Sequence, residues 1–163
     1  MYFYAIGLGS NRRHRRHGRP ADVLAAAMRA LAPVATSPII QTAPIGPSSR
    51  RFANAAILIE TSRAPRELLK DLKRIEREFG RRRGQRWGER VLDLDILLWS
   101  GGRWSSADLA VPHRELVRRR FALDPLVRIA PYWRIPGHGT VRQCAARLTR
   151  PRPIHRSGRR SGP

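Results

Sequence analysis

The spacing of hydrophobic residues predicts four strands within the first hundred positions. Aromatic and aliphatic runs over 2–9 and 52–61 have strand character, and we expect the first run, which ends in glycines, to lead into a tight turn. Apolar and polar residues alternate over 91–99, as they do in a strand with one buried face. Segment 34–41 is rich in β-branched residues but is interrupted by Pro38, so we expect it at an edge or bulge of the sheet.

Two amphipathic helices are predicted between these strands. Pro20 begins a segment whose apolar residues recur every three or four positions, and Pro65 begins a second one that ends at Gly80. The resulting order is strand, helix, strand, strand, helix, strand. This order predicts an α+β fold with a ferredoxin-like core (βαββαβ), in which helices pack on a mostly antiparallel sheet.

Shorter elements are predicted beyond residue 100. A pair of glycines leads into a small hairpin at 103–105. Helical segments are expected at 115–118, 125–129 and 141–148. Residues 150–163 are dominated by Arg, Pro, Ser and Gly and offer no apolar face, so we expect a single domain over 1–149 and a disordered basic C-terminal extension over 150–163.

The chain of 163 residues carries a formal net charge of +21. Such a charge is compatible with binding to nucleic acid, to an anionic surface or to a polyphosphate ligand, and it does not choose among them. Nearly all of the positive charge is arginine, since Lys70 and Lys73 are the two lysines. Arginine scattered in this way favours a solvated surface over a dedicated nucleic-acid face.

The cellular location is predicted from what the sequence lacks. The lone Cys144 cannot form an internal disulfide, and the first residues lack the basic leader and apolar run of a signal peptide. No apolar stretch approaches the length of a membrane span. We therefore expect a cytoplasmic protein that does not bind a membrane.

The most informative chemical pattern is a pair of aspartates on the strand predicted over 91–99. Residues two apart on a strand share a face, so Asp93 and Asp95 project together. The residues expected to face the core are Leu92, Leu94, Ile96 and Leu98. Two adjacent carboxylates repel each other and favour a cation between them, for which Mg²⁺ with phosphate oxygens is a good candidate. The alternative is the solvent-facing polar side of an antiparallel sheet.

Five arginines lie just before these carboxylates, at positions 81, 82, 83, 86 and 90. Planar guanidinium groups match phosphate oxygens, and a loop that carries several of them could close over a triphosphate as a lid. A solvated loop is the alternative. The chain has no Gly-x-x-x-x-Gly-Lys-Ser/Thr motif, so any ATP would have to be held by another architecture.

Several further polar positions have both a structural and a functional interpretation. His113 follows a Val-Pro pair and could be a structural or a catalytic histidine. Asn54 lies just inside a predicted strand, where a buried amide needs partners such as the edge of a heterocycle. Gly9-Ser10-Asn11 is compatible with an ordinary turn. His14 and His17 lie in an arginine-rich loop without metal-ligand companions, and we assign them no specific role.

Six short motifs occur in a fixed order along the chain. They are Gly9-Ser10-Asn11, Thr42-x-Pro44-x-Gly46-Pro47, Phe52-x-Asn54-Ala55-Ala56, Arg86-Trp87-Gly88-x-Arg90-x-Leu92-Asp93-Leu94-Asp95-Ile96, Val111-Pro112-His113 and Arg119-x-Phe121. In order and spacing they resemble the family of 6-hydroxymethyl-7,8-dihydropterin pyrophosphokinase. The resemblance extends over about 2–131, and the Arg-Trp-Gly to Leu-Asp-Leu-Asp segment is its most specific part.

The resemblance implies an activity and a set of site residues. Enzymes of this family transfer diphosphate from ATP to the hydroxymethyl group of the pterin, release AMP in folate biosynthesis, and use two magnesium ions with ATP. The implied metal ligands are Asp93 and Asp95. The implied catalytic residues are Asp95, Arg81, Arg83 and Arg90. The implied ATP contacts are Glu76, Arg86, Ile96, His113 and Arg119. The implied pterin contacts are Thr42, Ile45, Phe52, Asn54, Trp87 and Phe121.

Two alternatives to this activity remain at the level of sequence. The partners implied by the resemblance are a small-molecule pterin and ATP, with no specific nucleic acid and a monomeric chain. A nucleic-acid-binding module on the same fold would instead explain the basic loop 12–19 and the basic segment 150–163. A paralogue acting in another pterin pathway is the second alternative. The chain departs from the family in loop 12–19, which is longer and more basic, and in 48–51, where Ser-Ser-Arg-Arg replaces an acidic, Gln- and Pro-containing stretch.

Overall fold

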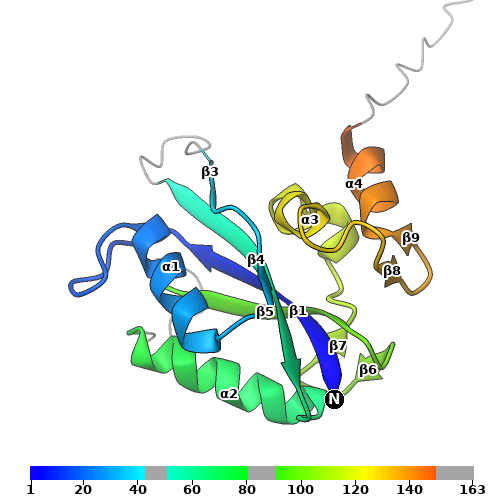
Figure 1. The fold of residues 1–163 in the computed structure, drawn as a ribbon, viewed down its shortest axis with the longest axis horizontal. Coiled ribbons are helices and arrows are strands. Elements are labelled where there is room, and N and C mark those ends of the chain that lie inside the picture. The colour runs from blue at the N-terminus through cyan, green and yellow to red at the C-terminus, as the bar shows by residue number, and fades with distance from the viewer. Residues whose placement is uncertain (43–50, 81–90, 150–163) are drawn as a thin grey trace, which may run out of the picture.

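The computed structural model describes residues 1–42, 51–80 and 91–149, and its largest sheet has five strands (Figure 1). The strands are β1 (Tyr2–Ser10), β2 (Ala35–Thr36), β3 (Ile40–Thr42), β4 (Phe52–Thr61) and β5 (Asp93–Trp99). Their order across the sheet is β2-β4-β1-β5, with β3 paired to another part of β4, and each pairing is antiparallel. Both β2 and β3 lie at one edge, on either side of Pro38, as the sequence predicts.

Two helices complete the ferredoxin-like order that the sequence predicts. Helix α1 (Pro20–Leu31) connects β1 to β2, and α2 (Pro65–Glu78) connects β4 to β5. Each begins with a proline in its first turn and has a carboxylate that accepts the backbone N–H just before the helix. Helix α2 is followed by Gly80, whose φ of 95° suits the left-handed residue that ends a helix.

Helices cover both faces of the sheet, and each face has its own hydrophobic core. The first core lies between the sheet and α1 and α2, and includes Leu24, Leu72 and Leu94. The second lies under α3 (Arg120–Val127) and α4 (Val141–Thr149), and includes Leu123 and Leu126. Figure 1 shows α1 and α2 together at one side of the sheet and α3, α4 and a small hairpin grouped apart from them.

A β-bulge in β5 changes which side chains face which core. The pairing of β5 with β1 shifts register between Ile96 and Leu98, which leaves Leu97 as the extra residue. Both Leu97 and Leu98 pack in the second core, whereas Leu94 and Ile96 belong to the first. The prediction that Leu98 shares a face with Leu94 and Ile96 is therefore wrong, because an unpaired residue reverses the alternation.

The remaining elements follow the predictions in part. The chain beyond Trp99 forms a hairpin of β6 (Trp104–Ser105) with β7 (Ala110–Val111), a 3₁₀ turn over Leu116–Arg118, and a second hairpin of β8 (Arg134–Ile135) with β9 (Gly139–Thr140). Helix α3 begins at Arg120 and contains Pro125, so the prediction of a helix starting at Pro125 is wrong. No helix among the described residues is long and apolar enough to cross a membrane.

Candidate active site

Two glycines of β1 open a groove on the face of the sheet that carries the paired aspartates. Gly7 pairs with Asp95 and Gly9 with Asp93, and on its other side Gly9 pairs with Asn54 of β4. Residues paired across a sheet point to the same face, so Asn54 and both aspartates share one face with glycines between them. The interpretation of Gly9-Ser10-Asn11 as an ordinary turn is wrong, since β1 stays extended to Ser10.

A cavity of about 730 Å³ lies over this groove and extends to α3. Among the residues that line it are seven that the sequence predicts for the site: Phe52, Asn54, Asp93, Asp95, His113, Arg119 and Phe121. They come from β4, from β5, from the chain between β7 and α3, and from α3 itself. The fold thus brings residues up to about seventy positions apart around one space large enough for a small-molecule ligand.

The carboxyl group of Asp95 lies in an environment that disfavours its charge. Burial raises its pKa, and the neighbouring carboxylate of Asp93 raises it further. His113 and Lys73 act in the opposite direction, while Glu76 again raises the pKa of Asp95. A divalent cation beside the two aspartates would remove their mutual repulsion.

His113 is held beside β5 by its backbone. Its N–H donates to the carbonyl oxygen of Leu97 at 3.0 Å. The side-chain Nδ1 accepts the N–H of Glu115 at 3.2 Å, so the neutral imidazole carries its proton on Nε2. This second nitrogen can therefore donate to an anion in the cavity.

Two accessible aromatic rings border the cavity. Phe52 on β4 is 41% exposed and Phe121 on α3 is 50% exposed, which leaves both rings open to a flat ligand. The guanidinium carbon of Arg119 lies 5.7 Å from the centre of the Phe121 ring. This cation–π contact links a candidate phosphate ligand to a candidate stacking ring.

Two predicted ATP contacts are buried away from the cavity. The side chain of Ile96 is 2% exposed and packs in the first core, on the opposite face of the sheet from the aspartates. Only the backbone of Ile96 could therefore meet a nucleotide. Glu76 is fully buried on α2 and accepts the backbone N–H of Leu94. Sequence reasoning did not foresee this burial.

The structure gives less information on the remaining predicted site residues. Thr42 is at the end of β3, where its backbone pairs with Phe52. Six predicted residues lie outside the described residues: Ile45, Arg81, Arg83, Arg86, Trp87 and Arg90.

The sequence analysis does not identify Gly7 or Lys73 as site residues, and it names Gly9 only within the Gly9-Ser10-Asn11 motif. The signal for the two glycines was their alternation within an otherwise apolar run, which places both on the face opposite the first core.

The chain matches the family model described as 7,8-dihydro-6-hydroxymethylpterin-pyrophosphokinase over residues 5–131. This chain belongs to that family. The matched region contains all of the seven cavity residues named above, together with the groove formed by β1, β4 and β5.

Individual relatives agree with the family match. The chain is 41% identical over 150 residues to a 2-amino-4-hydroxy-6-hydroxymethyldihydropteridine pyrophosphokinase of Methylorubrum extorquens, covering 88% of this chain and 91% of the relative. It is 40% identical over 132 residues to the protein of the same name from Haemophilus influenzae, covering 77% of this chain and 79% of the relative. It is also 48% identical over 90 residues to a mitochondrial folate synthesis bifunctional protein of Arabidopsis thaliana, covering 55% of this chain and 16% of the relative.

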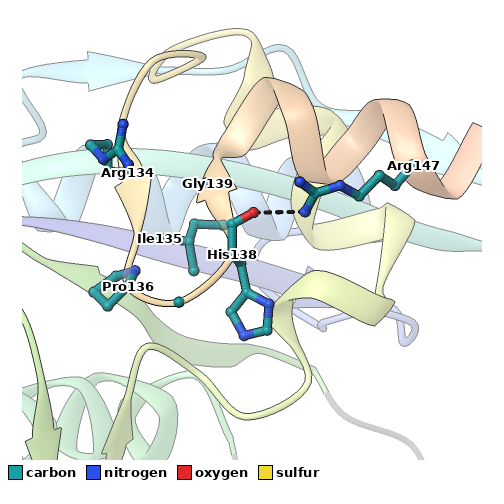
Figure 2. A pocket seen from close by; sticks show the side chains of 7 residues that line it. Arg134, Ile135, Pro136, His138, Gly139 and Arg147 are labelled. Atoms are coloured by element: carbon teal, nitrogen blue, oxygen red, sulfur yellow. Dashed lines mark hydrogen bonds between the residues drawn. The ribbon is translucent and has the colours of Figure 1, made fainter.

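A second cavity, of about 520 Å³, lies at the hairpin of β8 and β9, beyond the region that the family model matches (Figure 2). Arg134, His138 and Arg147 line it, and the Arg147 guanidinium donates to the carbonyl oxygen of His138 at 2.7 Å. None of the site residues predicted from the sequence lies in its lining. The first cavity is therefore the candidate active site.

Proposed function

We propose that this protein transfers the terminal diphosphate of ATP to the hydroxymethyl group of 6-hydroxymethyl-7,8-dihydropterin, and releases AMP, as a step of folate biosynthesis. The observation that carries the proposal is the convergence of Asp93 and Asp95 with Asn54, His113 and an accessible aromatic ring around one cavity in a chain of this family. Acidic, basic and stacking groups are all needed by a site that must hold both a triphosphate and a flat heterocycle.

The residues present fit magnesium held jointly with ATP. Among the described residues no group of three or more His, Cys, Asp or Glu side chains could hold a metal ion. Magnesium is commonly bound by one or two carboxylates together with substrate phosphates, so Asp93 and Asp95 would suffice as its protein ligands. When bound there, magnesium would neutralise charge on the phosphate oxygens as a Lewis acid.

The protein's part in the reaction is to align two substrates and to stabilise negative charge. We expect the pterin ring to stack against Phe52 and Phe121, with its polar edge hydrogen-bonded to Asn54. His113 and Arg119 would contact the polyphosphate. Such alignment turns the meeting of two substrates into a reaction within one complex.

The covalent change is a displacement at the β-phosphorus of ATP. The pterin hydroxyl oxygen forms a bond to that phosphorus, and the bond from phosphorus to the oxygen bridging it to the α-phosphate breaks. The bridging oxygen leaves with AMP, and the hydroxyl proton is released. Asp95 lines the cavity beside Asp93, so we assign it to accept or orient the hydroxyl proton.

The nucleic-acid-binding alternative is disfavoured by the same groove. Asp93 and Asp95 would repel a phosphate backbone unless a cation lay between them. A monomeric state and a cytoplasmic location stay predictions of the sequence.

The decisive experiment is to incubate the pure protein with ATP, Mg²⁺ and 6-hydroxymethyl-7,8-dihydropterin and to quantify AMP by chromatography. We expect AMP to form only when all three are present. Asp93→Ala and Asp95→Ala should each reduce the rate on the order of a hundredfold or more. Asp108→Ala, which changes an exposed aspartate outside the cavity, is the matched control. Wild-type rates in a folded Asp93→Ala or Asp95→Ala protein would refute the metal assignment.

A further inference from the structure

Glu76 is a fully buried carboxylate on α2, and its contacts differ from those expected of a residue that binds nucleotide directly. Its side chain is 0% exposed. The Oε1 atom accepts the backbone N–H of Leu94 at 2.8 Å, and Lys73 Nζ lies 3.1 Å from both carboxylate oxygens. A buried carboxylate is costly unless it is paired and hydrogen-bonded, and here both conditions are met.

The position of Leu94 gives this contact its significance. Leu94 lies between Asp93 and Asp95 on β5, which is the end strand of the five-stranded sheet. Its N–H donates to Glu76 of the helix rather than to β1. The outer edge of the strand is therefore fixed at the residue that lies between the two aspartates.

The pairing with Lys73 determines what Glu76 contributes electrostatically. A third carboxylate near two aspartates adds to their repulsion unless it is paired. Lys73 Nζ lies 3.1 Å from Glu76 Oε1 and forms an ion pair with it. The pair can thus hold β5 with little net charge of its own.

We propose that Glu76 is a positioning residue, which holds the Asp93 to Asp95 segment in place by accepting the N–H of Leu94. This inference rests on the proposed function, because the segment it positions is the proposed metal site. Hydrogen bonds that orient metal ligands from outside the coordination sphere typically contribute about ten- to hundredfold to metal affinity or activity.

Two conservative variants separate this role from a direct, charge-based contact with nucleotide. Glu76→Gln keeps the length of the side chain and an acceptor oxygen but removes the charge. Glu76→Asp keeps the charge but shortens the side chain by one carbon–carbon bond, about 1.5 Å. If the reach of the side chain to Leu94 matters, Glu76→Asp should bind metal more weakly than Glu76→Gln. If the negative charge toward ATP matters, Glu76→Gln should bind metal more weakly than Glu76→Asp.

The measurements are the Mg²⁺ concentration that gives half-maximal AMP formation and the affinity for Mn²⁺ measured by electron paramagnetic resonance with a non-hydrolysable ATP analogue. We expect Glu76→Asp to weaken both by about tenfold or more, and Glu76→Gln to change them by less than about threefold. Glu78→Asp and Glu78→Gln are the matched controls, since Glu78 lies on the same helix, 57% exposed and paired with Arg74. They should behave as wild type.

Hydrogen exchange of the Leu94 amide gives a readout that does not depend on activity. In the metal-free protein this amide should be protected in wild type and in Glu76→Gln, and should exchange faster in Glu76→Asp. If the Leu94 amide exchanged equally fast in the two variants, or faster in Glu76→Gln, the proposal would be overturned. Wild-type metal affinity in both variants would also overturn it. If Glu76→Asp did not fold, a tenfold loss of metal affinity in Glu76→Gln would still overturn the proposal. Wild-type metal affinity in Glu76→Gln, together with a protected Leu94 amide, would support it.

Failure of this inference differs from failure of the proposed function. A wild-type protein that forms no AMP would refute the function, whereas the exchange of the Leu94 amide would still report whether Glu76 holds β5.

Discussion

A side chain added at Gly9 would meet Asn54, because its Cβ would stand 3.5 Å from the side-chain oxygen of Asn54. The two residues pair across β1 and β4, and Asp93 pairs with Gly9 from the other side. The lack of a side chain at Gly9 therefore keeps open the space between the amide proposed to bind the pterin edge and the first aspartate. A distance of 3.5 Å is an ordinary contact, so a Cβ at this position would fit without clashing and would begin to fill this space.

Gly9→Val should impair pterin binding and leave the fold intact. A β-branched residue suits a strand, so we expect no loss of thermal stability. Because the isopropyl group would occupy the groove, the KM for the pterin should rise by about tenfold or more, with a smaller change in the KM for ATP. Steady-state kinetics and a thermal midpoint would measure both effects. Thr36→Val, at an exposed position of β2, is the control, and an unchanged pterin KM in Gly9→Val would show that the groove is not the pterin site.

Asp95→Asn should stabilise the metal-free protein at neutral pH. Burial and the carboxylate of Asp93 raise the pKa of Asp95 in the folded state, so the unfolded state releases this proton more readily. The ionised group then costs stability at pH values above its ordinary pKa, and costs none at lower pH, where both states are protonated. The thermal midpoint of Asp95→Asn relative to wild type should therefore rise with pH.

The measurement is a series of thermal unfolding curves in the presence of a chelator, from acid to neutral pH. Asp108→Asn is the control, because hydrogen bonding by Ser106 lowers the pKa of that exposed aspartate. A thermal midpoint of Asp95→Asn below that of wild type at neutral pH would contradict the expected cost of the ionised Asp95 carboxylate.

The main strands and helices could be predicted from the sequence because their signals are local. Proline at the start of α1 and α2 and the recurrence of apolar residues do not depend on distant partners. The bulge at Leu97 could not be predicted, because it exists only in the pairing with β1. Likewise, α3 begins five residues before Pro125, at Arg120, where the burial of Leu123 and Leu126 outweighs the missing N–H of the proline.

The candidate site was predictable to a similar extent. Alternation along one strand suffices to place Asp93 and Asp95 on the same face. The burial of Glu76 depends instead on how α2 lies against the outer edge of β5, and no periodicity reports that contact.

His17→Phe should reduce the loss of stability that accompanies acidification. The rings of His17 and Phe79 stack with centres 4.8 Å apart, and those of His17 and His14 also lie 4.8 Å apart. Partial burial lowers the pKa of His17, and the nearby charges of His14, Arg16 and Arg29 lower it further. The unfolded state therefore binds this proton more readily, so stability is retained above the ordinary histidine pKa and falls as the pH drops through it.

Phenylalanine at position 17 keeps the aromatic contact with Phe79 and removes the titration. We expect the decline in thermal midpoint toward pH 5 to become smaller, with little change at pH 8. His138→Phe, at an exposed position on the β8–β9 hairpin, is the control. An acid-side decline as steep in His17→Phe as in wild type would show that this histidine does not govern it.

Removal of residues 150–163 should separate non-specific nucleic-acid binding from the proposed catalysis. The segment carries five arginines, at 150, 152, 156, 159 and 160, but no residue of the candidate site. AMP formation should stay within a few-fold of the full chain. Binding to a labelled single-stranded oligonucleotide, followed by fluorescence anisotropy, should weaken at low salt. Each lost phosphate contact reduces the magnitude of the slope of log K against log salt by about 0.7, so the loss of five contacts corresponds to a change of up to about 3.5.

The full chain should itself release the oligonucleotide near physiological salt. A sequence-dependent complex that persisted there would favour the nucleic-acid-binding alternative. A folded truncated protein that formed no AMP would instead show that this segment contributes to the active site.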